Sequence, residues 1–339
     1  MRKSDFIGFL LLAFVIGCRF KTQLADFYAE RCYPVIAAGL SLCSSIFPFS
    51  LEEIVVIGFV VAFITVLVRS IRRKEGFLRW LGKTVRIAMW LVVWLYLGWG
   101  NNYFRTPLYP RMGIERATFE EASFSRFLSD YTNALNGTVD NTASWDKETL
   151  EADIKEFYST KVSDYGYTGL HQWQHVKKPL LNRLYSAVGV LGYMGPFLCE
   201  SQLNLDLPEV EYPFTLAHEL AHLAGVTSEA EANYWAYVYC RQSDNLAVRY
   251  SGHLALLPYV ASSAGSLLSD DVYSEWVDTI SDKAMEDYTA NREYWESKRV
   301  GIIDTVQRWM MDRFLRTNGV SEGARDYYGV IGMLMTMDR

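Results

Sequence analysis

Three apolar runs within the first hundred residues constrain most strongly how this chain folds. They are FIGFLLLAFVIGC (6–18), IVVIGFVVAFITVLV (54–68) and IAMWLVVWLYLGWG (87–100). Each is shorter than the roughly 20 residues that cross a bilayer as a helix, but flanking aromatic residues and long basic side chains extend such runs. One run alone would suit a buried core helix. Three runs separated by charged loops predict membrane spans over about 6–20, 51–69 and 86–100.

The charge of the chain divides at the end of the third run. Residues 1–101 carry twelve Lys and Arg against six Asp and Glu, and because the whole chain is −6, residues 102–339 must carry −12. A basic, apolar head followed by an acidic, polar body predicts a membrane anchor over 1–101 and a separate domain over 102–339. The acidic body argues against nucleic acid as a partner, since phosphate binding needs clustered Lys and Arg.

The loop between the second and third runs predicts the orientation of the anchor. Residues 69–86 hold seven positive charges and one acidic residue, so this loop is expected to stay in the cytoplasm. Arg2 and Lys3 agree, because two crossings separate the N-terminus from that loop. The third span then exports everything after Gly100, which predicts a multi-pass protein of the cytoplasmic membrane with a cytoplasmic N-terminus and an extracytoplasmic C-terminal domain.

The segment between the first two spans admits more than one interpretation. Residues 33–49 have a proline near each end and serines on one side, which favours an interfacial helix on the outer face over a fourth span. Cys18 ends a lipoprotein-like pattern, so lipidation of Cys18 is a rival hypothesis for the N-terminus. Cys32 and Cys43 flank the segment, and a disulfide between them is an alternative in an oxidising compartment.

Helical periodicity dominates the rest of the chain. Apolar residues recur at three- and four-residue spacing over 117–135 and 146–162, and a long helical stretch is expected from about 270 to 316. Residues 199–214 alternate apolar and polar side chains and end at prolines, which predicts a short edge strand and a loop. The expected fold class is therefore mainly α, with N-terminal transmembrane helices and a mostly helical exported domain containing a small β element.

The stretch HELAHLAGVTSEAEAN, residues 218–233, carries the chemistry. His218 and His222 lie four residues apart on one helical face, so both imidazoles can bind one cation, for which we expect Zn²⁺. Glu219 lies one position round the helix, where it can contact metal-bound water as a general base. The chain has only five histidines, so a chance match is rare. Gly225 is expected to end this helix.

A second helix follows at once and offers the third ligand. Ser228 is predicted to be its N-cap, and Ser228 with Glu231 forms a capping box that directs the Glu231 side chain away from the metal. Glu229 falls in the first turn and is the predicted third metal ligand. Asn233, four residues further on the same face, is expected to hydrogen-bond an imidazole, that of His218, and fix its tautomer.

Other residues are weaker candidates for the site. Hydrolysis needs a donor for the oxyanion of the tetrahedral intermediate, and Tyr250 in RYSGHL is the candidate catalytic residue for that role, against a purely structural alternative. His253 in the same stretch is interpreted as a surface histidine or as one that supports a ligand. Both lie some thirty residues after the HELAH motif, so their position relative to it depends on the fold.

Two further pairs of polar residues precede the motif. Glu200 and Asn204 could belong to a substrate-binding edge strand, to which a peptide adds as another strand. His171 and His175 also lie four residues apart, in HQWQH, but no glutamate follows the first histidine. We therefore interpret them as local or surface residues rather than as a second metal site.

Two resemblances sharpen these expectations. HELAH followed by ExxAN resembles the gluzincin arrangement, in which the glutamate four positions before an Asp or Asn is the third zinc ligand; here these are Glu229 and Asn233. More widely, the chain resembles a bacterial membrane-protein family known as domain of unknown function 3810, which implies a bundle of spans and a zincin-like exported domain. The segments that carry this second resemblance are WGNNYFRTPL (99–108), VKKP (176–179), residues 212–240, RYSGHL (249–254) and FLRTNG (314–319).

The expected function is that of a membrane-anchored zinc metallopeptidase of a bacterial inner membrane. Its domain over 102–339 would hydrolyse peptide or protein substrates in the periplasm or otherwise outside the cytoplasmic membrane. Two alternatives remain open from the sequence. Zinc could tie two helices together in a non-catalytic protein for sensing or assembly, or the enzyme could hydrolyse a non-peptide amide of the cell envelope.

Overall fold

Helices make up most of the fold, as the sequence predicts. The computed structural model describes residues 3–116, 120–320 and 329–337. The first elements are α1 (Lys3–Phe20), α2 (Thr22–Phe27), the π-helix η1 (Tyr28–Cys32), α3 (Tyr33–Ser45), α4 (Glu52–Arg72), α5 (Phe77–Gly98), the 3-10 helix η2 (Gly100–Phe104) and α6 (Leu108–Met112). Next come α7 (Glu121–Val139), α8 (Lys147–Phe157), η3 (Tyr158–Val162), η4 (Ser163–Tyr165), α9 (Asn182–Ala187), β1 (Gly192–Gly195) and β2 (Glu200–Leu203). The chain continues with α10 (Tyr212–Leu223), α11 (Glu229–Gln242), α12 (Leu246–Leu267), α13 (Asp270–Val277), α14 (Asp282–Lys298), α15 (Gly301–Thr317) and α16 (Val330–Met337).

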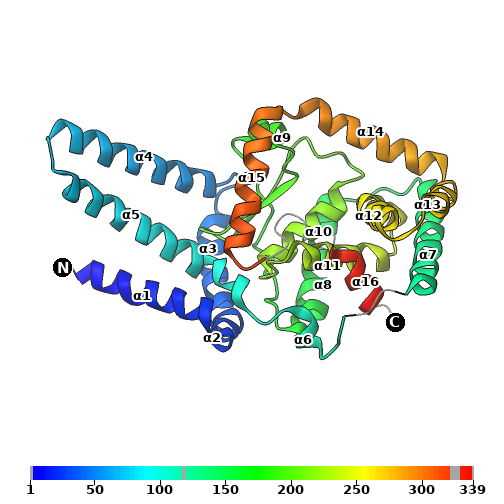
Figure 1. Ribbon diagram of the computed structural model, residues 1–339, viewed down its shortest axis with the longest axis horizontal. Coiled ribbons are helices and arrows are strands. Elements are labelled where there is room, and N and C mark those ends of the chain that lie inside the picture. The colour runs from blue at the N-terminus through cyan, green and yellow to red at the C-terminus, as the bar shows by residue number, and fades with distance from the viewer. Residues whose placement is uncertain (1–2, 117–119, 321–328, 338–339) are drawn as a thin grey trace.

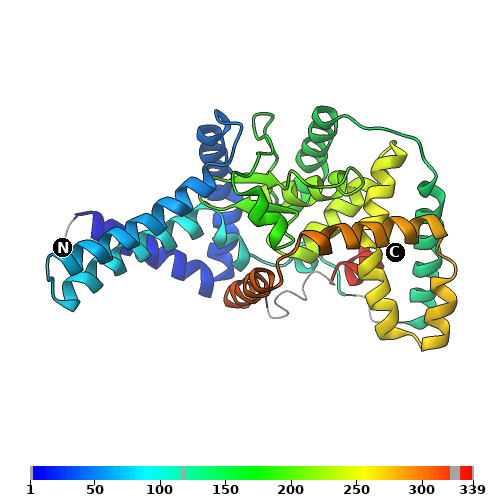
Figure 2. The same ribbon diagram turned by 90° about the horizontal axis from the view of Figure 1, so that it is seen from above.

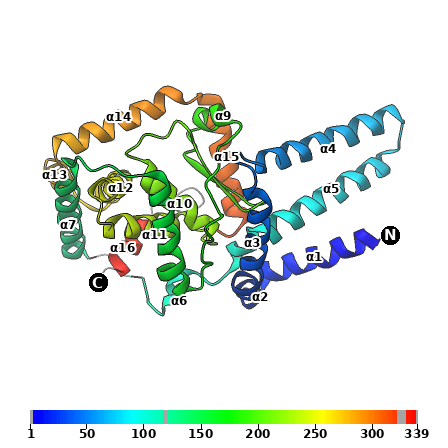
Figure 3. The same ribbon diagram turned by 180° about the vertical axis from the view of Figure 1, so that it is seen from behind.

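Three helices project together from one side of a compact body. Figures 1 and 3 show α1, α4 and α5 side by side, with the N-terminus at their far end. By length and composition α4 and α5 can each cross a membrane, and α1 joins the continuous stretch Thr22–Ser45 across a bend of 116° as a third candidate span. Large apolar side chains cover the outside of α4, as lipid contact requires. The structure thus carries two or three possible spans.

The third predicted span begins earlier than expected. Helix α5 starts at Phe77, because residues 77–86 combine Leu, Trp, Lys and Arg, which all tolerate the helix, before the apolar run begins. Lys83 pairs with Glu75 in the short connection to α4, at 2.6 Å. The basic loop predicted over 69–86 is therefore mostly helical, with only residues 73–76 between the two helices.

Helix α3 occupies the segment between the first two apolar runs. Tyr33, Ala37 and Ser41 are buried against the body, whereas Val35 and Leu42 on the other side are exposed. This two-sided character agrees with the predicted interfacial helix, whose contact with a membrane stays a prediction. All five cysteines are free thiols, so the alternative of a Cys32–Cys43 disulfide is not realised in this structure.

Two buried carboxylates fasten the first turn of α4 to the body. Glu200 accepts hydrogen bonds from the backbone N–H groups of Leu51 and Glu52 at 3.0 and 3.1 Å, and it pairs with Lys177 at 2.8 Å. Glu52 in return accepts the backbone N–H of Phe197 at 3.1 Å. Negative charge at a helix N-terminus is stabilising because the first N–H groups have no partner within the helix. These bonds fix the start of α4 to the β1–β2 hairpin.

The β element is a hairpin of two short strands. β1 and β2 are antiparallel, with Gly192 opposite Leu203 and Gly195 opposite Glu200. Lys177 pairs with β2 on the side away from β1. Strand β2 is therefore the inner strand of the hairpin, and β1 is its edge. The strand predicted within 199–214 is real but covers only Glu200–Leu203. Residues 204–211 are loop, and Pro213 starts α10 rather than ending a strand.

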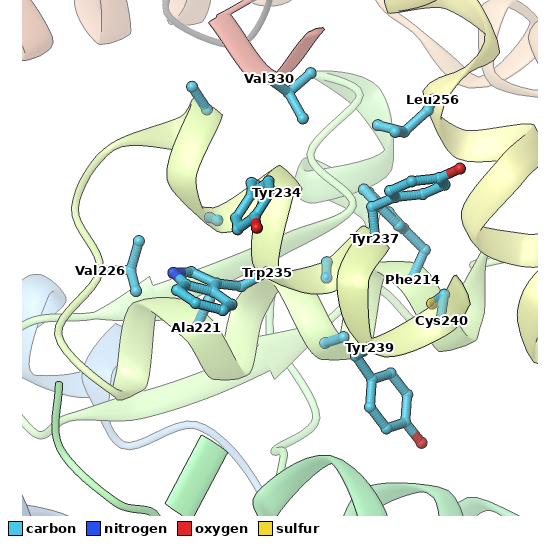
Figure 4. Packing of buried hydrophobic residues seen from close by; sticks show 14 of the residues in the cluster. Phe214, Ala221, Val226, Tyr234, Trp235, Tyr237, Tyr239, Cys240, Leu256 and Val330 are labelled. Carbon is cyan, nitrogen blue, oxygen red and sulfur yellow. The ribbon is translucent and has the colours of Figure 1, made fainter. Parts of the chain in front are cut away.

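The core of the body is built around α11, which packs on α10, α12 and α16. Small residues such as Ala221 and Ala236 allow α10 and α11 to approach closely, while Tyr234 and Trp235 fill the space around them, as Figure 4 shows. α12 comes equally close, because a Cβ on Gly252 would lie 2.5 Å from the Cβ of Cys240. This close packing holds the two helices of the 218–233 stretch in a fixed relation.

The outer helices differ in detail from the prediction. The long helical stretch expected from about 270 to 316 is three helices, α13 to α15, because Ser281 caps the N-terminus of α14 and the backbone at Arg299 is extended. The helix predicted over 117–135 appears as Glu121–Val139, and residues 117–119 lie outside the described residues. Figure 2, seen from above, shows α13 at the end of the body away from the N-terminal helices, while α14 runs from there back along the body towards α15.

Reporter fusions test the orientation that the basic residues predict. A reporter enzyme that works only in the cytoplasm should be active when it is joined after Gly76, between α4 and α5. A phosphatase that works only after export should be active when it is joined after Asp140. The physical reason is the excess of Lys and Arg around the α4–α5 turn. The reverse pattern would place the body in the cytoplasm and contradict the model with three spans and an internal N-terminus.

Candidate metal centre

Helix α10 carries both histidines of the HELAH motif and is defined sharply at each end. Pro213 lies in its first turn, where the missing N–H costs nothing. At the other end Gly225 adopts φ +95°, a conformation that glycine reaches without strain. The N–H of Gly225 donates to the His222 carbonyl at 3.0 Å, which closes the last turn. The predicted end of the metal helix at Gly225 is confirmed.

Two backbone carbonyls in the last turn of α10 accept hydrogen bonds from side chains outside the helix. The indole N–H of Trp99 donates to the carbonyl of His222 at 2.8 Å, and the Tyr33 hydroxyl donates to that of Leu223 at 2.7 Å. Trp99 directly follows α5 and Tyr33 begins α3, so both donors belong to the N-terminal region. A helix end buried in this way needs such donors, since its last carbonyls have no partner within the helix.

Helix α11 begins at the residue that the capping pattern predicts. The Ser228 hydroxyl accepts the backbone N–H of Glu231 at 3.3 Å, so Ser228 is the N-cap. The Glu231 carboxylate lies away from the histidines, where it accepts the backbone N–H of Leu108 at 3.2 Å and the hydroxyl of Tyr167. Glu231 therefore ties α11 to the region after the anchor, a role beyond the capping that the sequence predicts.

Three donor atoms converge between α10 and α11. The Nε2 atoms of His218 and His222 are 3.1 Å apart, and Oε2 of Glu229 lies 3.2 and 3.4 Å from them. Ligand atoms at about 2.0–2.1 Å from a tetrahedral zinc ion stand roughly 3.3 Å apart. The spacing of the three atoms thus fits a tetrahedral ion of this size. Within the described part of the chain, these three residues are the group of His, Cys, Asp and Glu side chains able to hold a metal ion.

The other nitrogen of each imidazole is already bonded. Nδ1 of His218 lies 2.8 Å from Oδ1 of Asn233, and Nδ1 of His222 lies 2.8 Å from the carbonyl oxygen of Val226. Both partners accept hydrogen bonds, so each Nδ1 carries a proton and each Nε2 is the nitrogen left to face the centre of the group. The contact of Asn233 with His218 is the one that the spacing of the sequence predicts.

Glu219 lies beside this group, buried and packed against β1. Its side chain packs on β1 so closely that a Cβ on Gly192 would lie 2.5 Å from Oε1. Among the described residues none hydrogen-bonds Oε2 of Glu219. Burial raises the pKa of Glu219 to about 6, although the two histidines oppose this shift. A buried carboxylate in this state is able to accept a proton from a neighbouring group near neutral pH.

The charges within the group depend on one another. Burial lowers the pKa of His222, but the Glu229 and Glu219 carboxylates and the Val226 carbonyl together outweigh burial and raise this pKa to about 9. Burial alone would raise the pKa of Glu229, whereas the neighbouring His222 and His218 hold it well below its usual range. The carboxylate therefore stays ionised, and a cation that enters the group competes with a proton for the imidazole nitrogens.

Tyr250 and His253, both in the RYSGHL stretch, make their contacts with other parts of the fold. The hydroxyl of Tyr250 donates to Asp287 of α14 at 2.7 Å, so the structure does not bring the candidate oxyanion donor to the three donor atoms. His253 is neither a surface residue nor a neighbour of a ligand. It is buried in the core between α7 and α11, where its Nδ1 lies 3.2 Å from the Tyr237 hydroxyl, and burial lowers its pKa to about 4.

The two pairs of polar residues that precede the HELAH motif contact other parts of the fold. Glu200 is buried at the start of α4, and Asn204 donates to the carbonyl of Val190 at 2.9 Å, so neither side chain faces an open strand edge. The imidazole of His171 stacks on Trp173 at 4.1 Å. His175 is exposed and lies 3.2 Å from Glu151, as expected for a surface residue.

Two residues of the site are missing from the sequence-based prediction. Trp99 bonds the last turn of α10, and Gly192 makes room for Glu219. Trp99 lies in WGNNYFRTPL, a segment that carries the family resemblance, and this position could have marked it as a candidate. Gly192 lies in GVLGYMG, where a glycine within a possible strand indicates a close approach of another group.

The fold and the site together define a mainly helical protein with helices able to cross a membrane and a buried His–His–Glu group able to hold a metal ion. The chain belongs to the family described as a protein of unknown function, DUF3810, whose model matches residues 28–335. No curated protein matches the chain. No solved structure matches it either.

Substitution of the two glutamates of α11 tests which one binds the metal. Glu229→Ala should bind zinc far more weakly than the wild type, because it removes one of three convergent donors. Glu231→Ala is the matched control: it should keep its zinc while losing about 1–3 kcal/mol of unfolding free energy, since buried hydrogen-bond donors lose their acceptor. Zinc titration and chemical denaturation of both variants measure these effects. Wild-type affinity in Glu229→Ala would contradict the assignment.

Proposed function

We propose that the protein is a membrane-anchored, zinc-dependent metallopeptidase that hydrolyses peptide bonds outside the cytoplasmic membrane. The observation that carries the proposal is the Glu219 carboxylate, which is buried beside the three donor atoms and has an oxygen with no partner among the described residues. A site that served structure alone would gain nothing from such a group, because burying an unpaired carboxylate costs free energy.

His218, His222 and Glu229 would hold the zinc ion. When bound, zinc supplies a water molecule of lowered pKa and polarises the substrate carbonyl. Three protein ligands are typical of catalytic zinc, which keeps an open position, whereas structural sites usually have four. The carbonyl of Val226 and the amide of Asn233 keep the imidazoles in the tautomer that binds a metal.

Glu219 would act as the general base. Its carboxylate would take a proton from the attacking water and later give it to the leaving amine, a role that needs a pKa near the working pH. Burial by itself raises the pKa of Glu219, which is the direction that this role needs. Gly192 fixes the place of the carboxylate, because the absence of a side chain there lets Glu219 lie against the strand.

The edge of β1 supports a peptide as the substrate. The N–H of Asn204 donates to the carbonyl of Leu191, so alternation along the hairpin turns the backbone groups of Gly192 and Met194 away from β2. In the described chain these outward groups have no backbone partner. At Gly192, which is half-buried, this edge beside Glu219 would offer an extended peptide main-chain hydrogen bonds in the place where the cleaved bond would lie.

The HExxH and ExxAN spacing supports a gluzincin-like site within a zincin-like exported domain. The order of the elements agrees with this proposal: an edge strand, a helix with two histidines, and a second helix with the glutamate and the asparagine. The exported position rests on the basic residues near the α4–α5 turn. Peptides or proteins outside the membrane would then be the substrates.

One observation favours a non-catalytic alternative. His218, Glu219, His222 and Glu229 are only 5 to 9 % exposed, so the zinc would have little contact with solvent. In that case the ion would tie α10 to α11 in a protein for sensing or assembly. A substrate with a non-peptide amide, from the cell envelope, would use the same catalytic residues and differ only in what the β1 edge recognises.

Glu219→Gln separates catalysis from metal binding. The variant should keep stoichiometric zinc, because Glu219 is not a ligand, while turnover of a peptide library falls by about 10²–10⁴-fold with the loss of the base. Mass-spectrometric detection of cleaved peptides and metal analysis measure the two effects on the full chain in detergent.

His218→Ala serves as the control that loses both metal and turnover. Loss of zinc from Glu219→Gln equal to that of His218→Ala would show that Glu219 has been given the wrong role. A wild type that holds zinc yet cleaves no peptide of the library would favour the non-catalytic alternative.

A further inference from the structure

Helix α15 exposes a continuous apolar face that the proposed function does not use. Ile303, Val306 and Met310 recur at helical spacing, and Val306 and Met310 are more than half exposed, at 53 % and 59 %. Trp309 beside them is 62 % exposed. The opposite side of the helix carries the buried residue Leu315, so the apolar face points away from the body. Soluble surfaces rarely present such a row.

The row continues directly from the end of the anchor. Phe314, its last member, packs edge-on against Tyr103 just after α5, with the rings 5.9 Å apart. Near the end of α15 the hydroxyl of Tyr96, on α5, donates to Oδ1 of Asn318 at 2.7 Å. These contacts fix one end of α15 to the last turn of a helix able to cross the membrane.

The direction of α15 also differs from that of the spans. In Figures 1 and 3 α15 runs across the direction of α4 and α5, at the edge of the body where these helices end. With α4 and α5 crossing a membrane, a helix in this direction would lie along the membrane surface. Its apolar face with an exposed tryptophan, and arginines beside it, has the composition of helices that rest in the interface of a bilayer.

We infer that α15 is an interfacial helix, which inserts Ile303, Val306, Trp309 and Met310 into the lipid surface beside the anchor. Lipid is the occupant because the row is continuous with a helix that is long and apolar enough to cross a membrane. The helix would hold the body at a fixed height above the bilayer. Arg313 lies over the Trp309 ring at 5.8 Å, where its charged end can reach the head groups, whereas Arg308 on the opposite side pairs with Asp304.

Nitroxide labels on α15 test this contact in the full chain. Single cysteines replace Val306 and Met310 in a background with Cys32→Ser and Cys43→Ser, and the protein is placed in nanodiscs of phosphatidylethanolamine and phosphatidylglycerol. Apolar oxygen should reach both labels several-fold better, relative to a water-soluble nickel chelate, than it reaches a control label. The control is Glu293→Cys on α14, an exposed position on a helix outside the row.

Each outcome decides the question. A high ratio of oxygen to nickel access at Val306 and Met310 supports insertion into lipid. The same ratio as at Glu293 would show that the row faces water and would overturn the inference. Exclusion of both reagents would overturn it as well, because a second copy or another protein would then cover α15. Neither result bears on zinc or turnover.

Discussion

The last turn of α10 is the point on which the rest of the structure depends. Its carbonyls accept hydrogen bonds from Trp99 and Tyr33, which lie in the N-terminal region, and Gly225 then reverses the chain so that α11 returns at once. The His222 carbonyl also accepts the N–H of Gly225, whereas removal of the Tyr33 hydroxyl would take the side-chain donor from the buried Leu223 carbonyl, at a cost of about 1–3 kcal/mol. The N-terminal segments therefore stabilise the end of the histidine helix.

The N-terminal helices and the candidate metal centre are therefore joined by direct contacts. The hairpin makes a second connection between them: Gly195 of β1 lies against Glu52 at the start of α4, and Gly192 of the same strand lies against Glu219. Each glycine leaves room for a carboxylate where a Cβ would lie about 2.5 Å from the carboxylate side chain. A body expressed without residues 1–101 would lose both the donors to α10 and the residues that fasten the hairpin.

The sequence predicts the local features well and the long-range ones poorly. The helical class, the end of α10 at Gly225 and the N-cap at Ser228 follow from spacing and residue type within a few positions of one another. The bond of Tyr250 to Asp287 and the burial of His253 depend on helices distant in the sequence, so no local pattern reveals them. Glu200 illustrates the same limit: strand alternation indicates its element, whereas its bonds to the first turn of α4 come from the tertiary fold.

X-ray absorption at the zinc edge of the full-length protein tests the central claim most directly. Two imidazole nitrogens and carboxylate or water oxygens should surround a stoichiometric zinc ion at about 2.0–2.1 Å, with outer-shell scattering from two histidines and no sulfur. This result would agree with the convergence of His218, His222 and Glu229. Sulfur at about 2.3 Å, or a protein that retains no stoichiometric zinc after reconstitution, would contradict the account.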